Sequence, residues 1–553
     1  MMDAERYRAL LADEIAPEGV EILQAARRID VDERPKIDPA SLRSIVGGYD
    51  ALIVRSRTHV TADVLAEAGR LKVIGRAGVG VDNIDVDAAT RRGIVVLNAP
   101  GGNTVSAAEH TMALLLAVVR HIPAAAEALR AGRWERSRFK GIELYGKMLG
   151  LVGAGRIGLE MARRARAFGM RVVAYDPYLL PERAAQARVE LVTLPDLLES
   201  SDVVSVHCPL TEETRGLIGP REIEMMKPDA YLLNVARGGI VDETALAEAL
   251  RTGRLAGAAF DVFAEEPAPR DHPLLGLENV VAVPHLGAAT REAQRSVGIE
   301  ICEAVRDALM RGDFRSAVNA PELAMEGYAE LAPLIDLSRR LGRLVCGLAR
   351  GSYRSLEVRY LGSRERALRP VAAAAVQGLL SEIVEPPLNL VNALHVARER
   401  GIVLQQVALG AGGTTGDYLE LELQTAEGRL RVAGTLLAED RPRISRIGDY
   451  HVDIPPRGTL LILKNRDVPG VIGEVGSVLG DAGVNIAEYH QARLEAGGEA
   501  LAAIAVDGAI ERAVIERLAD LDEVTRVWQI DLPEADAGAL GTWGAQAPAL
   551  QTP

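Results

Sequence analysis

The sequence predicts an α/β protein with two doubly wound domains, followed by two smaller α+β domains. Short aliphatic runs alternate with helical stretches over residues 1–290, which is typical of open parallel sheets. A turn with the spacing Gly-x-Gly-x-x-Gly stands between one such run and the helix after it. Residues 459–532 follow the order strand, helix, strand, strand, helix, strand. The 553 residues leave room for about three to five domains.

Composition narrows the classes of function. The net charge of −14 and the pI of about 5.3 give a surface that repels nucleic acid. Hydrophobic residues make up 48% of the chain, but no run of 18 apolar residues predicts a membrane span. The polar start of the chain predicts no secretory signal. Cys208, Cys302 and Cys346 lie far apart, which predicts neither a metal site nor disulfides and suits the cytoplasm.

Residues 1–100 predict the first sheet. Four runs are short and largely apolar, as strands buried on both faces of a parallel sheet are. The expected strands are Tyr7–Ala12, Ala51–Arg55, Leu71–Ile74 and Ile94–Leu97. The expected helices between them are Gly19–Ala26, Thr61–Ala68 and Asp87–Arg91.

Residues 101–290 repeat this pattern and begin with a long, mostly apolar helix, Thr104–Arg120. Six further strands are expected at Met148–Val152, Arg171–Tyr175, Val203–His207, Ala230–Asn234, Ala258–Asp261 and Val280–Pro284. The stretch Arg291–Arg311 predicts another helix, and Asn319–Pro321 indicates a boundary.

Residues 322–455 change character and predict an α+β module without a motif that we assign to chemistry. The expected helices are Leu331–Arg350, Arg369–Leu380 and Pro387–Arg400, and the expected strands are Ser355–Tyr360, Tyr418–Gln424 and Leu430–Leu436. Pro455–Gly458 is predicted to be a short linker.

The C-terminal elements follow the ferredoxin-like order. They are expected at Thr459–Lys464, Gly470–Asp481, Ile486–Arg493, Leu501–Val506, Ala509–Leu518 and Val524–Ile530. The segment after Asp531 is rich in Ala, Gly and Pro and has no periodicity, so we expect residues 533–553 to be disordered.

The glycine-rich turn, Gly153–Gly158, predicts a dinucleotide site in a Rossmann-like domain. The helix that it opens offers free N–H groups and a positive dipole end to a pyrophosphate. Gly153 permits the tight turn, Gly155 permits close approach of the backbone to phosphate, and Gly158 permits close helix–strand packing. Asp176 stands where a carboxylate accepts hydrogen bonds from the ribose hydroxyls and repels a 2′-phosphate. We therefore expect NAD rather than NADP.

Three polar residues that follow predicted strands form a candidate catalytic set. In an open parallel sheet, ligands lie beyond the carboxyl ends of strands, so Arg237, Glu266 and His285 can line one crevice. Imidazole is the commonest general acid/base, guanidinium is a permanent partner for a carboxylate, and a carboxylate orients an imidazole. His207 also ends a strand and is the competing histidine. The residues after it, Cys208-Pro209, indicate a cofactor-lining turn instead.

Several segments resemble the D-2-hydroxyacid dehydrogenase family: Gly153–Gly158, Val235–Asp242, Asp261–Pro267 and Pro284–Gly287. Others resemble the long-form phosphoglycerate dehydrogenases within that family: Val54–Ser56, Gly75–Asn83 and Gly132–Arg136. The C-terminal module resembles an ACT domain through Asn465–Gly470 and Ala482–Ile486. The module before it resembles the intervening domain of the long form.

The resemblance implies a division of the chain into five parts. These are a discontinuous substrate-binding domain (1–100 and 291–319), an NAD-binding domain (101–290), an intervening domain of the allosteric substrate-binding kind (320–455), an ACT regulatory domain (456–532) and the tail (533–553). The implied reaction is the NAD-dependent oxidation of 3-phosphoglycerate to 3-phosphohydroxypyruvate, the first step of L-serine biosynthesis. Arg237, Glu266 and His285 are its implied catalytic residues.

The resemblance also implies the binding residues. For the substrate, which carries a carboxylate and a phosphate, they are Arg55, Ser56, Arg76, Gly78, Asn103 and Arg136. For NAD they are Gly153, Gly155, Arg156, Ile157, Gly158, Asp176, Val79, His207, Cys208, Pro209, Thr214, Ala236, Asp261, Gly287 and Ala288. For an effector such as L-serine they are Asn465, Asp467 and Asn485, and no metal ligand is expected.

The sequence departs from the family at Val79, where a hydroxyl residue is common, and at Cys208, where Thr is common.

The resemblance also implies a homo-oligomer, either a dimer or a tetramer. Two alternatives stay open: a dehydrogenase for another D-2-hydroxy acid, such as glycerate or lactate, and a non-enzymatic NAD-sensing protein. Arg55 with Arg76 favours a phosphorylated substrate, and the ACT module argues against the sensor.

Overall fold

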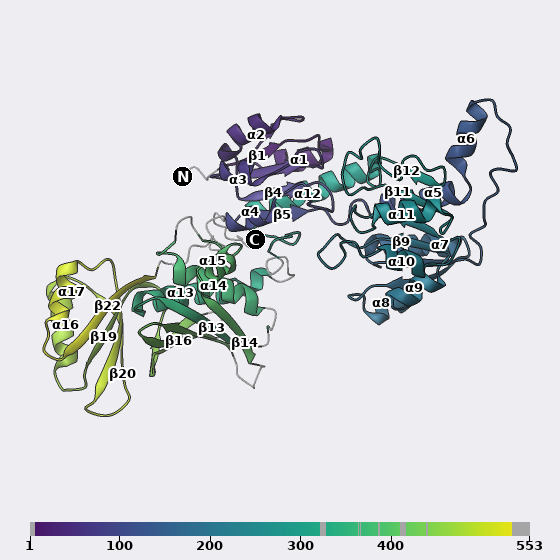
Figure 1. Ribbon diagram of the computed structural model, residues 1–553. Coiled ribbons are helices and arrows are strands. Elements are labelled where there is room, and N and C mark those ends of the chain that lie inside the picture. Colours follow the sequence, from purple (N-terminus) through teal and green to yellow (C-terminus); the bar gives the residue numbers. More distant parts are fainter. Residues whose placement is uncertain are drawn as a thin grey trace, which may run out of the picture. The chain divides into compact units, whose positions relative to one another are not determined.

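The computed structural model describes residues 6–320, 328–362, 364, 367–384, 388–409, 416–437 and 441–532. The chain divides into two compact units, residues 99–300 and residues 1–98 with 301–553. The described residues form four sheets, of which one lies in the first of these units and three in the second (Figure 1). The segment 533–553, for which the sequence predicts disorder, lies outside the described residues.

The first sheet is parallel and has the strand order β2-β1-β3-β4-β5. Its strands are β1 (Tyr7–Leu11), β2 (Ile29–Glu33), β3 (Ala51–Val54), β4 (Val73–Arg76) and β5 (Val95–Asn98). Its helices are α1 (Pro17–Ala25), α2 (Pro39–Ile45), α3 (Ala62–Ala66) and α4 (Val86–Arg91). The sequence pattern does not predict β2 or α2. Strand β2 lies at the sheet edge and alternates with acidic residues, so it has no apolar run to reveal it.

The second sheet, in residues 99–300, is parallel and has the order β12-β11-β10-β9-β6-β7-β8. Its strands are β6 (Met148–Val152), β7 (Arg171–Tyr175), β8 (Glu190–Leu191), β9 (Val203–Val206), β10 (Tyr231–Asn234), β11 (Gly257–Phe260) and β12 (Val280–Ala282). The order reverses direction between β7 and β9, on either side of β6, and this is where ligands bind in such sheets. The six predicted strands are all present, and the two-residue β8 is additional.

The helices of this part are α5 (Thr104–Val119), α6 (Ile122–Arg130), α7 (Arg156–Ala167), α8 (Pro181–Ala187), α9 (Leu194–Ser200), α10 (Pro220–Met225) and α11 (Glu243–Arg251). Helix α12 (Arg291–Arg311) begins in this part and ends in the other unit. Helix α5 packs against the sheet through Leu115, Val118 and Val119, all nearly inaccessible to solvent. No single helix in the described residues is long and apolar enough to cross a membrane. Helices α5 and α6 satisfy that test only together, and they bend by 61° at their junction.

The third sheet has the order β14-β13-β15-β16-β17-β18. Its strands are β13 (Tyr353–Leu361), β14 (Val403–Leu409), β15 (Asp417–Thr425), β16 (Gly428–Leu437), β17 (Arg441–Ile447) and β18 (Tyr450–Ile454), and its helices are α13 (Ala332–Leu348), α14 (Leu368–Leu380) and α15 (Ala393–Glu399). Strands β14, β17 and β18 are not in the sequence prediction. The helix expected from Pro387 begins only at Ala393, because the side chains of Asn389 and Asn392 accept backbone N–H groups before it.

The fourth sheet has the order β20-β21-β19-β22 and the ferredoxin-like connectivity that the sequence predicts. Its elements are β19 (Gly458–Arg466), α16 (Val471–Asp481), β20 (Ile486–Arg493), β21 (Glu499–Val506), α17 (Arg512–Ala519) and β22 (Val524–Leu532). Leu461 and Leu463 face its own helices. The neighbouring Leu460 and Ile462 are equally buried, and helix α13 packs on β22, where Gly347 approaches Ile530. The sheet is therefore covered on its second face too.

Candidate active site

The glycine-rich turn joins β6 to α7 and packs against the end of β9. Gly153 has φ +94°, and a Cβ atom there would lie 2.7 Å from the backbone nitrogen of Cys208. A Cβ on Gly158 would lie 2.5 Å from the carbonyl oxygen of Gly153. By contrast, no atom lies within 4 Å of a Cβ built on Gly155. The two flanking glycines thus close the turn, and the middle one keeps open space beside the helix N-terminus for a phosphate.

Asp176 follows β7 and reaches back to this turn. One carboxylate oxygen accepts the N–H of Ala154 at 2.8 Å, and the other accepts the N–H of Tyr178 at 2.9 Å. These bonds fix the carboxylate beside the turn with lone pairs left over. The side chain is half-buried, so a ribose diol can reach it. The geometry fits a dinucleotide.

His207 and Cys208 lie at the end of β9. Nε2 of His207 lies 2.9 Å from Oγ of Ser205, and burial lowers the pKa of His207 to about 4. Burial also raises the pKa of the Cys208 thiol to about 11. His207 is therefore uncharged near neutral pH, which makes it a poor competitor for the acid/base role. Thr214, half-buried, donates to the carbonyl of Pro209 at 2.6 Å and closes the next turn.

His285 and Glu266 form a hydrogen-bonded pair. Nδ1 of His285 lies 2.8 Å from Oε2 of Glu266, and the two side chains are 48% and 38% exposed. The other carboxylate oxygen of Glu266 accepts the N–H of Phe263 at 3.0 Å. Burial pushes the pKa of Glu266 up, but these two hydrogen bonds outweigh it and hold that pKa below its usual range. The ionised carboxylate fixes the proton of His285 on Nδ1 and leaves Nε2 for a ligand.

Asp261, at the end of β11, holds the loop that carries His285. Its carboxylate accepts the N–H groups of Leu286 at 2.6 Å and Gly287 at 2.8 Å, and its carbonyl accepts the N–H of His285 at 2.8 Å. Nε2 of His110 lies 3.2 Å away. Asp261 is 1% exposed, and these bonds outweigh its burial and lower its pKa. The sequence predicts Asp261 as a cofactor contact, and this stays a prediction; in the structure its carboxylate holds this loop.

The same network contains a residue that the sequence does not predict, His110. His110 lies on α5, an apolar helix far from any motif, so nothing in the sequence linked it to Asp261. From the same helix, Ser106 donates to the carbonyl of Gly287 at 2.8 Å. Ala288, next in the loop, is half-buried. The loop after β12 is therefore fixed from both α5 and β11.

Arg237 lies in the turn after β10. The buried Asn234 shapes this turn: its side-chain N–H donates to the carbonyl of Arg237 at 2.8 Å, and its side-chain oxygen accepts the N–H of Ala236 at 3.2 Å. Nη1 of Arg237 donates to the carbonyl of Ala236 at 2.6 Å. The half-buried guanidinium is thus held beside the strand end.

In the other unit, the loop after β3 is held by two side chains outside the predicted site. Asp13 accepts the N–H of Arg55 at 2.7 Å, and Asn83 donates to the carbonyls of Arg55 at 2.7 Å and Thr58 at 2.6 Å. Ser56 is exposed in this loop. The loop that carries Arg55 is therefore fixed at both ends.

Arg76 ends β4 and lies across Gly78. A Cβ atom on Gly78, which has φ +151°, would lie 1.5 Å from Nη1 of Arg76. Only glycine leaves room for the guanidinium there. Val79, next in the chain, is held through its carbonyl, which accepts from the side chain of Asn98 at 2.7 Å.

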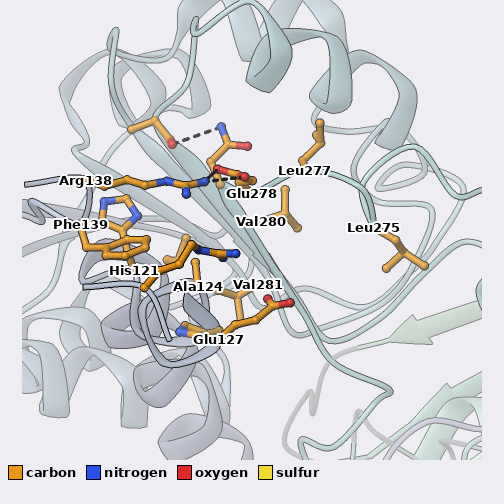
Figure 2. A pocket seen from close by; sticks show the side chains of 15 residues that line it. His121, Ala124, Glu127, Arg138, Phe139, Leu275, Leu277, Glu278, Val280 and Val281 are labelled. Carbon is orange, nitrogen blue, oxygen red and sulfur yellow. Dashed lines mark hydrogen bonds and ion pairs between the residues drawn. The ribbon is translucent and has the colours of Figure 1, made fainter. Parts of the chain in front are cut away.

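Asn103 precedes α5, and its side-chain oxygen is buried without a hydrogen-bond partner among the described residues. Arg136 is exposed in the segment after α6. Nearby, Arg138 contacts Glu278 at 2.6 Å beside a cavity of about 320 Å³ (Figure 2). None of the predicted catalytic or cofactor residues lines this cavity. Exposed Arg156 and half-buried Ile157 open α7.

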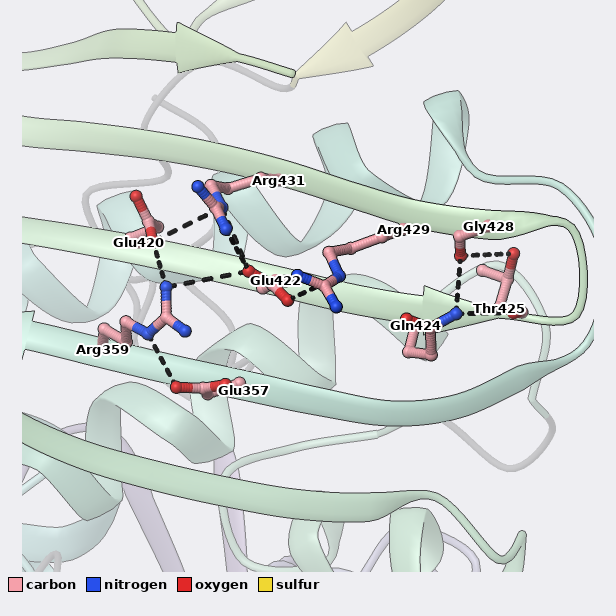
Figure 3. Close-up of polar contacts among 9 residues, drawn as sticks. All are labelled: Glu357, Arg359, Glu420, Glu422, Gln424, Thr425, Gly428, Arg429 and Arg431. Atoms are coloured by element: carbon pink, nitrogen blue, oxygen red, sulfur yellow. Dashed lines mark hydrogen bonds and ion pairs between the residues drawn. The ribbon is translucent and has the colours of Figure 1, made fainter. Parts of the chain in front are cut away.

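The third sheet carries a network of opposite charges across β13, β15 and β16 (Figure 3). Arg359 contacts Glu357 at 2.6 Å and Glu420 at 2.7 Å, and Arg431 contacts Glu422 at 2.7 Å. The carboxylates raise the pKa of both arginines. The positive charge is thus compensated within the sheet, which argues against an anion site there.

The three effector candidates lie on the fourth sheet and its loops. Asn465 is 2% exposed and accepts from the side chain of Gln491 at 3.3 Å. Asp467 accepts the N–H of Gly497 and an N–H of Arg493, each at 3.1 Å. These bonds lower its pKa. Asn485 is exposed and donates to Asp507 at 2.6 Å. Asp467 and Asn485 are accessible to a small molecule, and Asn465 is covered.

Family comparisons match three parts of the chain. Residues 112–287 match the NAD-binding domain of D-isomer-specific 2-hydroxyacid dehydrogenases. Residues 330–448 match the D-3-phosphoglycerate dehydrogenase intervening domain, and residues 459–523 match the ACT domain.

Curated relatives align over nearly the whole chain. D-3-phosphoglycerate dehydrogenase of Methanocaldococcus jannaschii is 40% identical over 528 residues, 95% of this chain and 100% of the relative. The Bacillus subtilis enzyme of the same name is 38% identical over the same shares. Among solved structures, a glyoxylate reductase from Paecilomyes thermophila is 31% identical with a TM-score of 0.53, and covers 58% of this chain and 99% of its own.

Proposed function

The chain belongs to the D-3-phosphoglycerate dehydrogenase family, and from this we infer that it oxidises 3-phospho-D-glycerate to 3-phosphohydroxypyruvate with NAD. It is an NAD-dependent oxidoreductase, and its reaction is the first step of L-serine biosynthesis. The observation that carries the chemistry is the His285–Glu266 pair beyond the strand ends of the NAD-binding domain.

We propose that His285 acts as the general base. Its Nε2 takes the hydroxyl proton of the substrate, and Glu266 holds the ring and stabilises the imidazolium that forms. A bound NAD would supply the hydride acceptor for the carbon that carries this hydroxyl group. In the reverse direction His285 returns the proton to the carbonyl oxygen, so the charges balance in both directions.

Arginines are the proposed ligands of the anionic substrate. Arg237, held at the end of β10, suits the carboxylate and polarises the carbonyl group. Arg55 and Arg76 suit the phosphate. Asp13 fixes the loop that carries Arg55, and Gly78 leaves room for the guanidinium of Arg76. The other proposed substrate contacts lie at loop or helix ends: Ser56, Asn103 and Arg136.

For NAD, we propose that the turn Gly153–Gly158 and the start of α7 hold the pyrophosphate and that Asp176 holds the adenosine ribose. His207, Cys208, Pro209 and Thr214 line the neighbouring strand end. The other proposed contacts are Val79, Ala236, Gly287 and Ala288.

We also propose regulation and self-association. The accessible Asp467 and Asn485 support an amino-acid effector, and L-serine is the specific proposal.

Exposed apolar side chains on the NAD-binding unit, including Leu129 and Trp134, support a homo-oligomer, either a dimer or a tetramer. Three free cysteines fit a reducing cytoplasm.

The experiment follows NADH absorbance with purified protein and 3-phosphohydroxypyruvate, with pyruvate and hydroxypyruvate as competing substrates. We expect rapid turnover only with the phosphorylated acid. Equal rates with all three acids would indicate another D-2-hydroxy acid dehydrogenase. Binding of NAD without turnover would indicate a sensor. A titration with L-serine, repeated on Asp467→Ala, tests the effector proposal separately.

A further inference from the structure

Glu243 and His272 form a further carboxylate–imidazole pair in the NAD-binding unit, and both of its side chains are largely buried. Nε2 of His272 lies 2.8 Å from Oε2 of Glu243, and the side chains are 7% and 11% exposed. Nδ1 of His272 faces the N–H of Leu274 at 3.3 Å and therefore acts as the acceptor. The ring proton must then lie on Nε2 and be donated to Glu243. Neither residue belongs to the catalytic set.

This pair is tied to the catalytic pair through one dipeptide. The N–H of Ala264 donates to Oε1 of Glu243 at 2.8 Å, and the N–H of Phe263 donates to Oε1 of Glu266 at 3.0 Å. Two adjacent peptide groups thus bind two carboxylates, one on α11 and one beside His285. A shift of this dipeptide would move Glu266 directly.

Packing fixes the dipeptide from its other sides. A Cβ atom on Gly238, the residue after Arg237, would lie 1.9 Å from the carbonyl oxygen of Phe263. The ring of His272 also packs edge-on against Phe263, with centroids 5.2 Å apart. The segment that positions Glu266 is therefore in contact with the segment that positions Arg237.

We propose that Glu243 and His272 are positioning residues for the dehydrogenase reaction, and that they act by holding the Phe263–Ala264 dipeptide so that Glu266 meets His285. This inference rests on the proposed function. Since the pair touches neither catalytic side chain, its effect must pass through this dipeptide, by way of the backbone N–H of Ala264 and the ring of Phe263. A displacement of about 1 Å in such a group can lower a rate by about 100-fold.

Three variants separate positioning from simple stability. Glu243→Gln keeps the shape of the side chain, but its amide cannot accept from both Ala264 and His272. His272→Met removes the donor, and His272→Gln keeps a donor near the position of Nε2. We expect Glu243→Gln and His272→Met to lower kcat by about 10- to 100-fold, to leave KM for NAD unchanged and to shift the pH profile of kcat/KM. His272→Gln should restore most of the loss.

Glu222→Gln is the matched control. Glu222 also lies in the first turn of a helix, α10, and its carboxylate accepts the N–H of Gly219 at 3.2 Å, outside the catalytic loops. The Glu222→Gln variant should have a lower Tm and an unchanged pH profile of kcat/KM. If Glu243→Gln and Glu222→Gln behave alike, the positioning role is wrong.

The NMR signal of the Nδ1–H group of His285 in the same variants needs no substrate, so it separates this inference from the proposed function. We expect Glu243→Gln to shift this signal, identified by its loss in His285→Gln, because the hydrogen bond from Nδ1 to Glu266 changes. An unchanged signal would overturn the inference even if the wild-type protein proved inactive on phosphohydroxypyruvate.

Discussion

Nδ1 of His285 lies 2.8 Å from Oε2 of Glu266, although 19 residues separate them and they follow different strands. The same carboxylate accepts a second hydrogen bond from the N–H of Phe263. The pair therefore depends on backbone that is fixed independently of either side chain. Its position beyond β11 and β12 gives the imidazole one free nitrogen for a ligand.

Glu266→Gln should lower kcat/KM for phosphoglycerate oxidation by about 100- to 10,000-fold, because the imidazolium formed on His285 loses its counter-charge. The pKa of Glu266 lies below the usual range of a glutamate carboxyl group, so the wild-type carboxylate stays ionised at mildly acidic pH. The counter-charge to His285 is lost only when the pH falls through this lowered pKa. Steady-state rates between pH 6 and 10 measure the change. The exposed neighbour Glu265 provides the control, and Glu265→Gln with a comparable loss would contradict this role.

Asp261→Asn should lower both stability and kcat. Its amide nitrogen would face a buried N–H donor of Leu286 or Gly287, which costs about 1–3 kcal/mol and loosens the loop of His285. Thermal unfolding and steady-state rates measure the two effects. Asp50→Asn also removes a fully buried carboxylate, and it should lower Tm with little effect on kcat. An Asp261→Asn variant with normal kcat would show that the loop needs no such support.

Gly78→Ala should raise KM for 3-phosphoglycerate by about 10- to 100-fold, because the new methyl group displaces the guanidinium of Arg76 and weakens a charge-assisted bond to the phosphate. KM for NAD should stay unchanged. Gly428 has a nearly equal φ of +145° with no atom within 4 Å of its Cβ position. Gly428→Ala therefore carries the same backbone strain, and it should leave both constants unaltered.

Asp176→Ser should weaken NAD binding and reduce the preference for NAD over NADP, by about tenfold or more, because the carboxylate no longer accepts from the ribose or repels a 2′-phosphate. Rates with both cofactors give the ratio. Asp196→Ser, a first-turn residue of α9, is the control. A variant that keeps the full NAD preference would remove Asp176 from the ribose site.

His207 predicts a pH dependence of stability. Its folded pKa of about 4 lies below the ordinary value of 6.5, so the unfolded chain binds a proton first as the pH falls. The folded state should therefore lose up to about 3 kcal/mol between pH 6.5 and pH 4 from this group. His207→Gln cannot titrate, so its Tm should fall less than that of the wild type over this range. Parallel Tm curves would show that His207 does not stay neutral in the folded protein.

The sequence by itself determined where the main strands of the sheets lie along the chain, the dinucleotide turn and the ferredoxin-like module. Buried parallel strands are continuous apolar runs, and the turn needs glycines at fixed spacing, so both leave a local signal. Edge elements such as β2 and β14 were missed because half-exposed strands lack such runs. The late start of α15 was missed because asparagine side chains compete with the helix for backbone N–H groups.

Only the tertiary structure decided which groups support the candidate site. The sequence named His285, Glu266 and Arg237 from their places after strands, but it could not show that His110 meets Asp261 or that Ala264 links Glu243 to the catalytic loop. These contacts join segments from 21 to 151 residues apart, and polar contacts of this kind follow no periodicity along the chain. They exist because the parallel sheet brings the carboxyl ends of its strands to one edge, where each loop is held by its neighbours.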